Sequence, residues 1–328
     1  MLLFRRQMLR LASAVAMSVL VAGTAHADQF PSRPITLVVQ AAAGGASDLV
    51  ARLVAQRLTA NLGVPVVVDN APAAGGVVAV KRLVRASPDG YTLMICGTKS
   101  AIAESLFKSH PYNLSKDLIQ VAPIVSTDLA LVVDGNSKLK NVGDLVREIK
   151  TRPGKVTIGV GDTIGGIQHL AAELLKSSVQ GNFLIVPYGS LSKLEVAVRG
   201  GEVDAAVELV PGLISLLQQG GLRALATTGK ERQGDLPNVP TIAEAGLPKA
   251  ELTPLSFVAA PAGTPAAVIA RLNAALKKVL AEPEFQKAMT SRGLRPVSAE
   301  SSADAQRMMD ADIEKWRGIV KLANVPLQ

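Results

Sequence analysis

Short apolar runs rich in β-branched residues alternate along this chain with longer segments whose apolar residues recur every three or four positions. The run Ile35–Val39, for example, precedes Ser47–Leu62, in which apolar residues have helical spacing. A strand pattern followed by a helix pattern predicts a βαβ unit with parallel strands. Because the alternation continues over most of the chain, the sequence predicts an α/β fold.

The alternation falls into two halves with the same plan. In the first half we predict strands at 35–39, 65–68 and 91–96, with helices at 47–62 and 77–85. In the second half we predict strands at 129–133, 156–160, 183–186, 205–207 and 222–227, with helices at 144–150, 168–177 and 193–199. A strand at 255–260 then returns to the first half, followed by helices at 266–280, 283–292 and 303–322.

We therefore expect two lobes, each a mainly parallel sheet flanked by helices. The first lobe comprises residues 28–127 and 253–328, and the second comprises residues 128–252. Two crossover segments join the lobes and form a hinge. The chain of 328 residues is long enough for two such domains.

Each half contains a strand that ends in a glycine pair opening directly into a helix: Gly44-Gly45 and Gly165-Gly166. The start of a helix leaves about four N–H groups unpaired and carries roughly half a positive charge. It can therefore hold a carboxylate or phosphate without Arg or Lys. We call residues 44–48 the first anion seat and residues 165–168 the second anion seat. One seat per lobe predicts a cleft between the lobes, although Gly44 and Gly45 could also form a plain turn.

The N-terminal segment predicts export. A basic segment at 5–10 precedes the apolar stretch Leu11–Gly23, and Ala25-His26-Ala27 fits a signal-peptidase site. The apolar stretch is too short to span a bilayer of roughly 30 Å. Residues 1–27 therefore predict a cleaved signal peptide, with a signal anchor as the alternative. The arginine pair at 5–6 leaves the Sec and twin-arginine routes both open.

Charge and cysteine content exclude several classes of protein. The chain has a net charge of +8, but its basic residues are dispersed and no cluster indicates nucleic-acid binding. Cys96 is the only cysteine, so no intrachain disulfide can form. Its place in an apolar run predicts a buried small side chain.

No catalytic, metal or cofactor motif has local support. The segment 159–165 has a G-x-G-x-x-x-G spacing, but the strand after it ends in Val186-Pro187-Tyr188, without an acidic residue for a ribose. Outside the predicted signal peptide, His110 and His169 are the only histidines, and they lack metal-ligand spacing. We expect His169 to pack or cap. The G-x-S-x-G and P-loop motifs are both absent from the sequence.

Several longer motifs occur in a fixed order over essentially the whole mature chain. They are Gly44-Gly45-Ala46-Ser47-Asp48, Pro65-Val66-Val67-Val68-Asp69-Asn70, Ser87-Pro88-Asp89-Gly90-Tyr91-Thr92-Leu93, Val186-Pro187-Tyr188, Ala243-Glu244-Ala245-Gly246-Leu247-Pro248 and Pro261-Ala262-Gly263-Thr264-Pro265. By these motifs the chain resembles the substrate-binding proteins of tripartite tricarboxylate transporters, the Bug receptors.

The resemblance implies a periplasmic binding protein of two lobes, similar to type II, that closes over a small organic anion and delivers it to membrane permease subunits. It implies a monomer that is not an enzyme, needs no cofactor or metal and has no nucleic-acid partner. A sensory subunit for a two-component system has the same fold and is the alternative. An exported enzyme is a more remote one.

From the two anion seats and the resemblance together, we select the residues that are candidates to contact the ligand. The first lobe contributes Gly44, Gly45, Ala46, Ser47 and Asp48, with Thr98, Lys99 and Ser100 beside them. The second lobe contributes Asp162, Gly165, Gly166, Gln168, Tyr188 and Glu208. Ser47 and Asp48 are also candidate helix caps, and for Asp48 a plain cap and a ligand contact are equal alternatives.

Three segments depart from the family's usual motifs, and Lys99 lies in a loop where family members usually carry small hydroxyl residues. Gln40-Ala41-Ala42-Ala43 stands where Pro-Phe-Pro-Pro is common, so an aromatic wall is lost. The segment 165–169 lacks the usual hydroxyls, and the amide of Gln168 takes their place. Glu208-Leu209 replaces an Asp-Asn pair.

These departures bear on the ligand. Lys99 is a counter-ion for a carboxylate if it faces the cleft, and otherwise faces solvent. Asp162 and Glu208 would neutralise Lys99 or hold an ammonium group, which would favour amino-acid-like ligands. Only 3% of the residues are aromatic, with Tyr188 alone near the predicted cleft, which disfavours a stacked aromatic acid.

Overall fold

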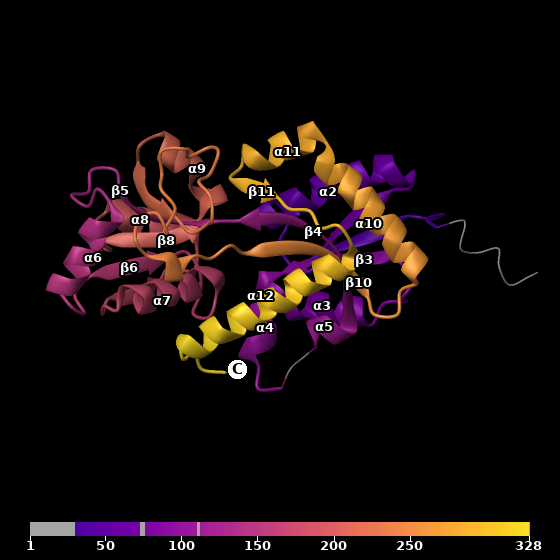
Figure 1. Cartoon of the computed structure of the whole chain (residues 1–328), viewed down its shortest axis with the longest axis horizontal. Helices are drawn as coiled ribbons and strands as arrows, with labels where there is room; N and C mark the ends of the chain where they lie inside the picture. Colours follow the sequence, from indigo (N-terminus) through magenta and orange to yellow (C-terminus); the bar gives the residue numbers. More distant parts are fainter. Residues whose placement is uncertain (1–29, 73–75, 110–111, 328) are drawn as a thin grey trace, which may run out of the picture.

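Two lobes lie side by side along the long axis of the molecule (Figure 1). The computed structural model describes residues 30–72, 76–109 and 112–327. The predicted signal peptide and His110 lie outside these ranges. Within them, no helix is both long and apolar enough to cross a membrane.

Lobe 1 is built on a six-stranded sheet with the order β11-β4-β10-β3-β1-β2. Its strands are β1 (Ile35–Val39), β2 (Val66–Asn70), β3 (Thr92–Gly97), β4 (Leu118–Thr127), β10 (Leu255–Pro261) and β11 (Leu294–Pro296). One face packs against α2 (Ala46–Leu62), α10 (Ala266–Ala281) and α11 (Pro283–Thr290). The other face packs against α3 (Val77–Val84), α4 (Thr98–Leu106), α5 (Leu114–Asp117) and the first half of α12 (Ser302–Leu322).

Lobe 2 is built on a five-stranded sheet with the order β7-β6-β8-β5-β9. Its strands are β5 (Leu129–Asp134), β6 (Thr157–Val160), β7 (Leu184–Pro187), β8 (Ala205–Leu209) and β9 (Leu222–Thr227). One face is covered by α6 (Val142–Thr151) and α7 (Ile167–Val179), together with the short helix η3 (Pro248–Ala250). The other face is covered by α8 (Leu191–Arg199) and α9 (Val210–Gln218).

The two-lobed α/β fold predicted from the sequence is confirmed, but both sheets are mixed rather than mainly parallel. In lobe 1, β1 is parallel to β2 and β3, whereas β10 is antiparallel to β3 and β4. In lobe 2, β6 is parallel to β7 and β8, whereas β5 is antiparallel to β8 and β9. β5 and β10 are antiparallel to their neighbours because each is the first strand after a crossover. Each enters its lobe at the hinge and runs away from it, whereas the neighbouring strands run toward the hinge.

This topology brings the functional ends of the strands together. Strands β1 and β3 run toward lobe 2, and β6 and β8 run toward lobe 1, so their carboxyl ends meet between the lobes. Open α/β sheets bind ligands at the carboxyl ends of their strands. The fold therefore places the loops after β1, β3, β6 and β8 around one interlobe space.

The C-terminal helix α12 spans both lobes, although the sequence pattern assigns residues 253–328 to the first. Ala305, Met309 and Ile313 pack into the core of lobe 1, whereas Trp316 and Ile319 pack into the core of lobe 2. Figure 1 shows this helix running diagonally from one lobe to the other. Its two ends thus stabilise both lobes with one rigid element.

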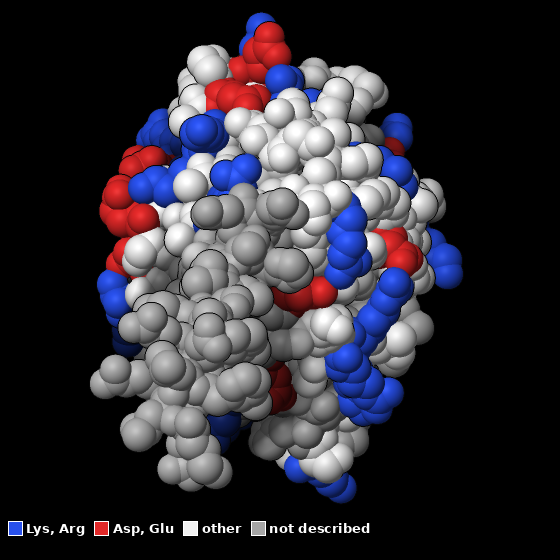
Figure 2. Space-filling model, turned by 90° about the vertical axis from the view of Figure 1, so that its right-hand side faces the viewer, with Lys and Arg blue, Asp and Glu red and all other residues white. Residues whose placement is uncertain are grey.

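On the end of lobe 1 seen in Figure 2, Lys and Arg side chains lie in several small groups, and Asp and Glu side chains adjoin some of these groups. A nucleic-acid-binding face would present a continuous stripe of Lys and Arg. Both signs of charge occur among the described residues of this face, as on an ordinary solvated surface.

Candidate functional site

A cavity of about 900 Å³ lies between the lobes and is lined by residues from both. Lobe 1 contributes the end of β1 and the start of α4, and lobe 2 contributes the loop at 161–166, the start of α7 and the end of β8. Both crossovers also reach it, through Thr127 and Pro254. A concave site of this size, open to both lobes, suits a small ligand.

The cavity brings together part of the set of residues predicted from the sequence. Those that line it are Ser47, Thr98, Lys99, Asp162, Gly165, Gly166, Gln168 and Glu208. Those that do not are Gly44, Gly45, Asp48, Ser100 and Tyr188, and the side chain of Ala46 is not among those that the structure describes. The hydrogen bonds of the polar side chains in this set show what each of them does in or near the cavity.

Asp48 organises the first anion seat from behind. Its Oδ2 accepts hydrogen bonds from the Gly44 N–H at 2.9 Å and from Arg52 Nε at 2.8 Å, and its Oδ1 accepts one from Asn70 Nδ2 at 2.9 Å. The Arg52 hydrogen bond is the main reason that the pKa of this carboxyl is lowered to about 2. Asp48 therefore uses the Gly44 N–H itself, and Ser47 is the exposed polar residue of this seat that reaches the cavity.

The start of α4 forms the rest of the lobe 1 wall. A Cβ at Gly97 would lie 2.1 Å from the carbonyl oxygen of Leu255, so only glycine lets β3 pass so close to β10. The Thr98 hydroxyl donates to Asp312 Oδ2 at 2.6 Å and accepts from the Leu255 N–H at 2.9 Å. Thr98 can therefore offer a ligand its backbone but not its hydroxyl.

Ser100 contributes to the cavity wall indirectly, by holding Gln40. The sequence motifs identify Gln40 only as part of a segment that departs from the family pattern. The buried Ser100 hydroxyl donates to Gln40 Oε1 at 3.0 Å, and Gln40 lines the cavity. Gln40 thus lies on the wall with its amide oxygen already held by Ser100. Its position directly after the first strand was the signal that could have identified it.

Lys99 lies in the first turn of α4, is exposed and lines the cavity. In the part of the chain that the structure describes, its ammonium group has neither a hydrogen bond nor an ion pair. It is also the only basic side chain among the described lining residues. A charge in this position, beside a helix N-terminus, favours an anionic group in the cavity.

The second anion seat is partly filled by an acidic side chain of the protein itself. Asp162 Oδ1 accepts a hydrogen bond from the Thr163 N–H at 2.8 Å. Its carboxylate lies against Gly166, the residue that caps α7, where a Cβ would be only 2.0 Å from Oδ2. The positive end of α7 therefore already faces a carboxylate.

Glu208 lies beside this seat and is 4% exposed. Its Oε1 accepts hydrogen bonds from Gln168 Nε2 and the Leu209 N–H, both at 2.7 Å. Its Oε2 packs against Gly161 and has no hydrogen-bond partner among the described residues. Burial is the main reason that the pKa of Glu208 is raised, and the nearby Asp162 charge raises it further.

Two other side chains near the second seat have structural roles. Tyr188 lies outside the cavity, where its ring packs near Gly159 and its hydroxyl lies 3.4 Å from Glu202 Oε2. His169 Nδ1 accepts a hydrogen bond from the Gly165 N–H at 3.4 Å, and burial lowers the pKa of its imidazole. Among the described residues, no group of three or more His, Cys, Asp and Glu is arranged to hold a metal ion.

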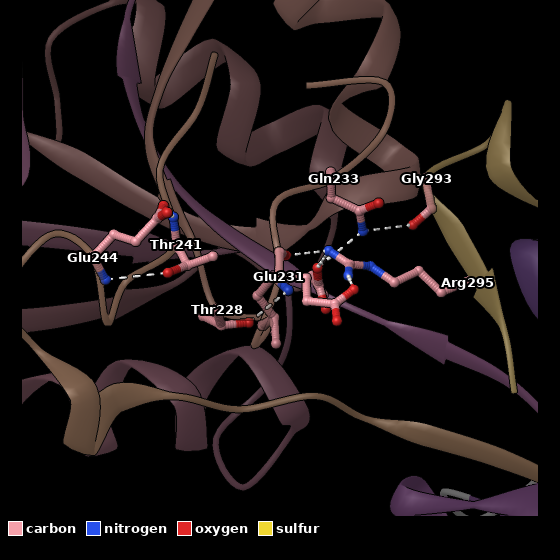
Figure 3. A network of polar contacts seen from close by, with 9 residues as sticks. Thr228, Glu231, Gln233, Thr241, Glu244, Gly293 and Arg295 are labelled. Carbon is pink, nitrogen blue, oxygen red and sulfur yellow. Dashed lines mark hydrogen bonds and ion pairs between the residues drawn. The ribbon is translucent and has the colours of Figure 1, made fainter. Parts of the chain in front are cut away.

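A polar network holds the first crossover at Asp128, whose side chain is 1% exposed. Its Oδ2 accepts from Gln233 Nε2 at 3.0 Å and from Arg295 at 2.8 Å. Gln233 also donates to the Gly293 carbonyl at 3.2 Å. Figure 3 shows Gln233 and Arg295 converging from different elements, with Glu231 close to Arg295. Because Arg295 belongs to β11 of lobe 1, the network links both lobes to the hinge.

Two α/β lobes that are joined by two crossovers and enclose a cavity define a two-lobed solute-binding protein. A family model described as the tripartite tricarboxylate transporter family receptor matches residues 50–325. The chain therefore belongs to this family, whose members are periplasmic receptors that bind solutes. This membership confirms the resemblance drawn from the sequence motifs, and the family and fold are those of receptors rather than of enzymes.

Individual relatives are similar to this chain over nearly its whole length. Protein BugT of Bordetella pertussis is 33% identical, and the match covers 98% of this chain and 99% of that protein. The solved structure of the periplasmic binding protein BugD has a TM-score of 0.76 at 28% identity and covers 91% of this chain and 100% of its own.

Two solved structures were determined with a ligand. An R. palustris protein with adipate has a TM-score of 0.78 at 30% identity, covering 90% of this chain and 99% of its own. MatC of Rhodopseudomonas palustris with bound malate has a TM-score of 0.75 at 27% identity, covering 89% of this chain and 100% of its own. The ligands of both relatives are small organic acids.

Proposed function

We propose that this protein captures a small organic anion, a carboxylate or an amino-acid-like compound, in the interlobe cavity and delivers it to the membrane permease subunits of a tripartite tricarboxylate-type transporter. The observation that carries the proposal is Lys99, whose ammonium group has no partner among the described residues and lies beside a helix N-terminus on the wall of a cavity shared by both lobes. The adipate and malate found with two relatives support a carboxylate as the ligand.

Closure supplies the signal to the permease. A ligand in the cavity contacts both lobes only when they are close together, so binding shifts the hinge equilibrium by its differential affinity for the closed state. We propose that the protein acts as a periplasmic monomer, exported by residues 1–27 through the Sec or twin-arginine route, and that no cofactor or metal takes part.

The test is a thermal-shift screen of the purified protein with panels of mono-, di- and tricarboxylates and amino acids. A ligand at about one hundred times its Kd should stabilise the folded state by about 2.7 kcal/mol. The change K99Q should weaken the best ligand at least tenfold, because a charge-assisted hydrogen bond contributes about 1.5–3 kcal/mol.

The matched control is K150Q, at an exposed lysine in the last turn of α6 that does not line the cavity. It should leave both affinity and melting temperature unchanged. The absence of stabilisation by every compound in the panels would contradict the proposed function.

A further inference from the structure

The charged side chains on the cavity walls are separated by sign between the lobes. Among the described lining residues three are charged: Lys99 from lobe 1, and Asp162 and Glu208 from lobe 2. One wall is therefore cationic and the opposite wall is acidic. A ligand that spans the cavity meets opposite charges at its two ends.

The lobe 1 wall suits a carboxylate. Lys99 lies in the first turn of α4, and Ser47 lies in the first turn of α2, so backbone N–H groups at two helix starts adjoin a free ammonium group. The Gln40 side chain, whose amide oxygen is held by Ser100, also lies on this wall. The described lining residues of lobe 1 include no Asp or Glu that would oppose an anion.

The lobe 2 wall is unsuited to a second carboxylate. The start of α7 would attract one, but the Asp162 carboxylate already lies against Gly166 at that position. Glu208 is buried beside it, with Oε1 saturated by two donors and Oε2 without a partner among the described residues. An incoming anion would face two acidic groups, whereas a donor would complete the hydrogen bonding of Glu208.

The space between the two walls is mainly apolar. Side chains from both lobes contribute, including Ile102, Leu106 and Phe107 from α4 and its end, and Ile164 from the loop before α7. Ile164 is 58% exposed, so its apolar surface is available to a ligand. An aliphatic segment between the charged ends of a ligand would cover it.

We infer that the cavity selects a dipolar ligand, with its carboxylate against Lys99 in lobe 1, an aliphatic middle, and an amino group against Asp162 and Glu208 in lobe 2. The inference rests on the proposed function and narrows it from organic anions in general to amino carboxylates. Simple dicarboxylates, the type of ligand found with two relatives, are expected to bind this chain more weakly.

Isothermal titration with ligands matched in length tests the inference. The pairs are hexanedioate with 6-aminohexanoate and pentanedioate with 5-aminopentanoate, and 2-amino acids with aliphatic side chains form a third set. The best amino carboxylate should bind at least tenfold more tightly than the best dicarboxylate. Dicarboxylates that bind equally well or more tightly would overturn the inference while supporting the proposed function, whereas binding by no compound would count against both.

Two variants test whether the acidic wall of lobe 2 causes the preference for amino carboxylates over dicarboxylates. E208Q and D162N should each weaken the amino carboxylate at least tenfold and leave dicarboxylates unchanged or bound more tightly. The control E314Q removes an exposed carboxylate on α12 outside the cavity and should change neither. Melting curves verify that each variant is folded. If E208Q does not fold, D162N alone provides the test. If the folded variants retain the preference of the unchanged protein, the inference is wrong.

Discussion

Two glycines occupy equivalent positions at the two anion seats, yet only one of them excludes a side chain. Gly45 caps α2 with φ −81° and ψ 172°, and Gly166 caps α7 with φ −76° and ψ 171°. Any residue can adopt these angles. A Cβ at Gly45 would make an ordinary contact, 3.6 Å from the Ala42 carbonyl oxygen, whereas a Cβ at Gly166 would lie 2.0 Å from Asp162 Oδ2.

We therefore predict different costs for the two alanine substitutions. G45A should lower the free energy of unfolding only by the amount by which an N-cap position favours glycine over alanine. G166A must in addition displace the Asp162 carboxylate, so it should lower the free energy of unfolding by about 1–2 kcal/mol more than G45A. Denaturant unfolding of both variants measures this difference, and equal losses would show that Asp162 moves aside without cost.

At the residue scale, the sequence predicted which loops reach the cavity but not which way each side chain points. Thr98 and Ser100 were expected to face a ligand, yet their hydroxyls bond Asp312 and Gln40, which lie 214 and 60 positions away. Two of the donors to Asp48, Gly44 and Arg52, are four positions away in the sequence. The third donor, Asn70, lies beside Asp48 only because β2 places it there. Such partners are set by tertiary packing, which local patterns do not encode.

At the scale of elements, α12 is tied to α4 through a buried carboxylate. Asp312 Oδ2 accepts the Thr98 hydroxyl, and its Oδ1 accepts Trp316 Nε1 at 3.1 Å. Burial raises the pKa of Asp312 from 3.8 to about 6, because these two hydrogen bonds only partly offset the loss of solvation. The helix that spans both lobes is therefore anchored beside the cavity wall by a group that titrates.

This anchor predicts a pH dependence. The folded-state pKa lies above the unfolded value, so between about pH 4 and pH 6 the folded state binds more protons than the unfolded state. The free energy of unfolding should thus fall as pH rises through this window, by up to about 3 kcal/mol from this group, and level off above it. In D312N that contribution should be absent.

Unfolding measured from pH 4 to pH 7 for the unchanged protein, D312N and the exposed control D235N isolates the contribution. The curve of D235N should be parallel to that of the unchanged protein. A D312N curve that also remains parallel would contradict the assignment.

Two of the elements that the sequence analysis missed, β4 and α4, lack the patterns that made others predictable. The strand β4 is buried on both faces and contains Pro123, so it shows no alternation and carries a residue that strands avoid. The structure accommodates Pro123 opposite Phe257, next to a register shift in the pairing of β4 with β10. The polar residues of α4, among them Lys99, Ser100 and Ser105, lie on different sides of the helix, so its sequence shows no clear apolar stripe.

At the scale of the whole molecule, the network at Asp128 holds the hinge with a buried ion pair. Arg295 reaches Asp128 from lobe 1, and its own side chain is 23% exposed. Burial is the main reason that the pKa of Asp128 is raised, and Arg295 opposes that shift. Removing one partner of a buried pair leaves the other charge uncompensated, which is more costly than removing both.

We therefore predict that R295M lowers the free energy of unfolding by about 2–4 kcal/mol, and that D128N/R295M recovers at least half of this loss. The control R33M breaks an exposed ion pair with Asp89 and should cost less than about 1 kcal/mol. Chemical unfolding of the four proteins of the D128N and R295M double-mutant cycle, together with R33M, gives the coupling energy. A coupling near zero would contradict a role for this ion pair in holding the hinge.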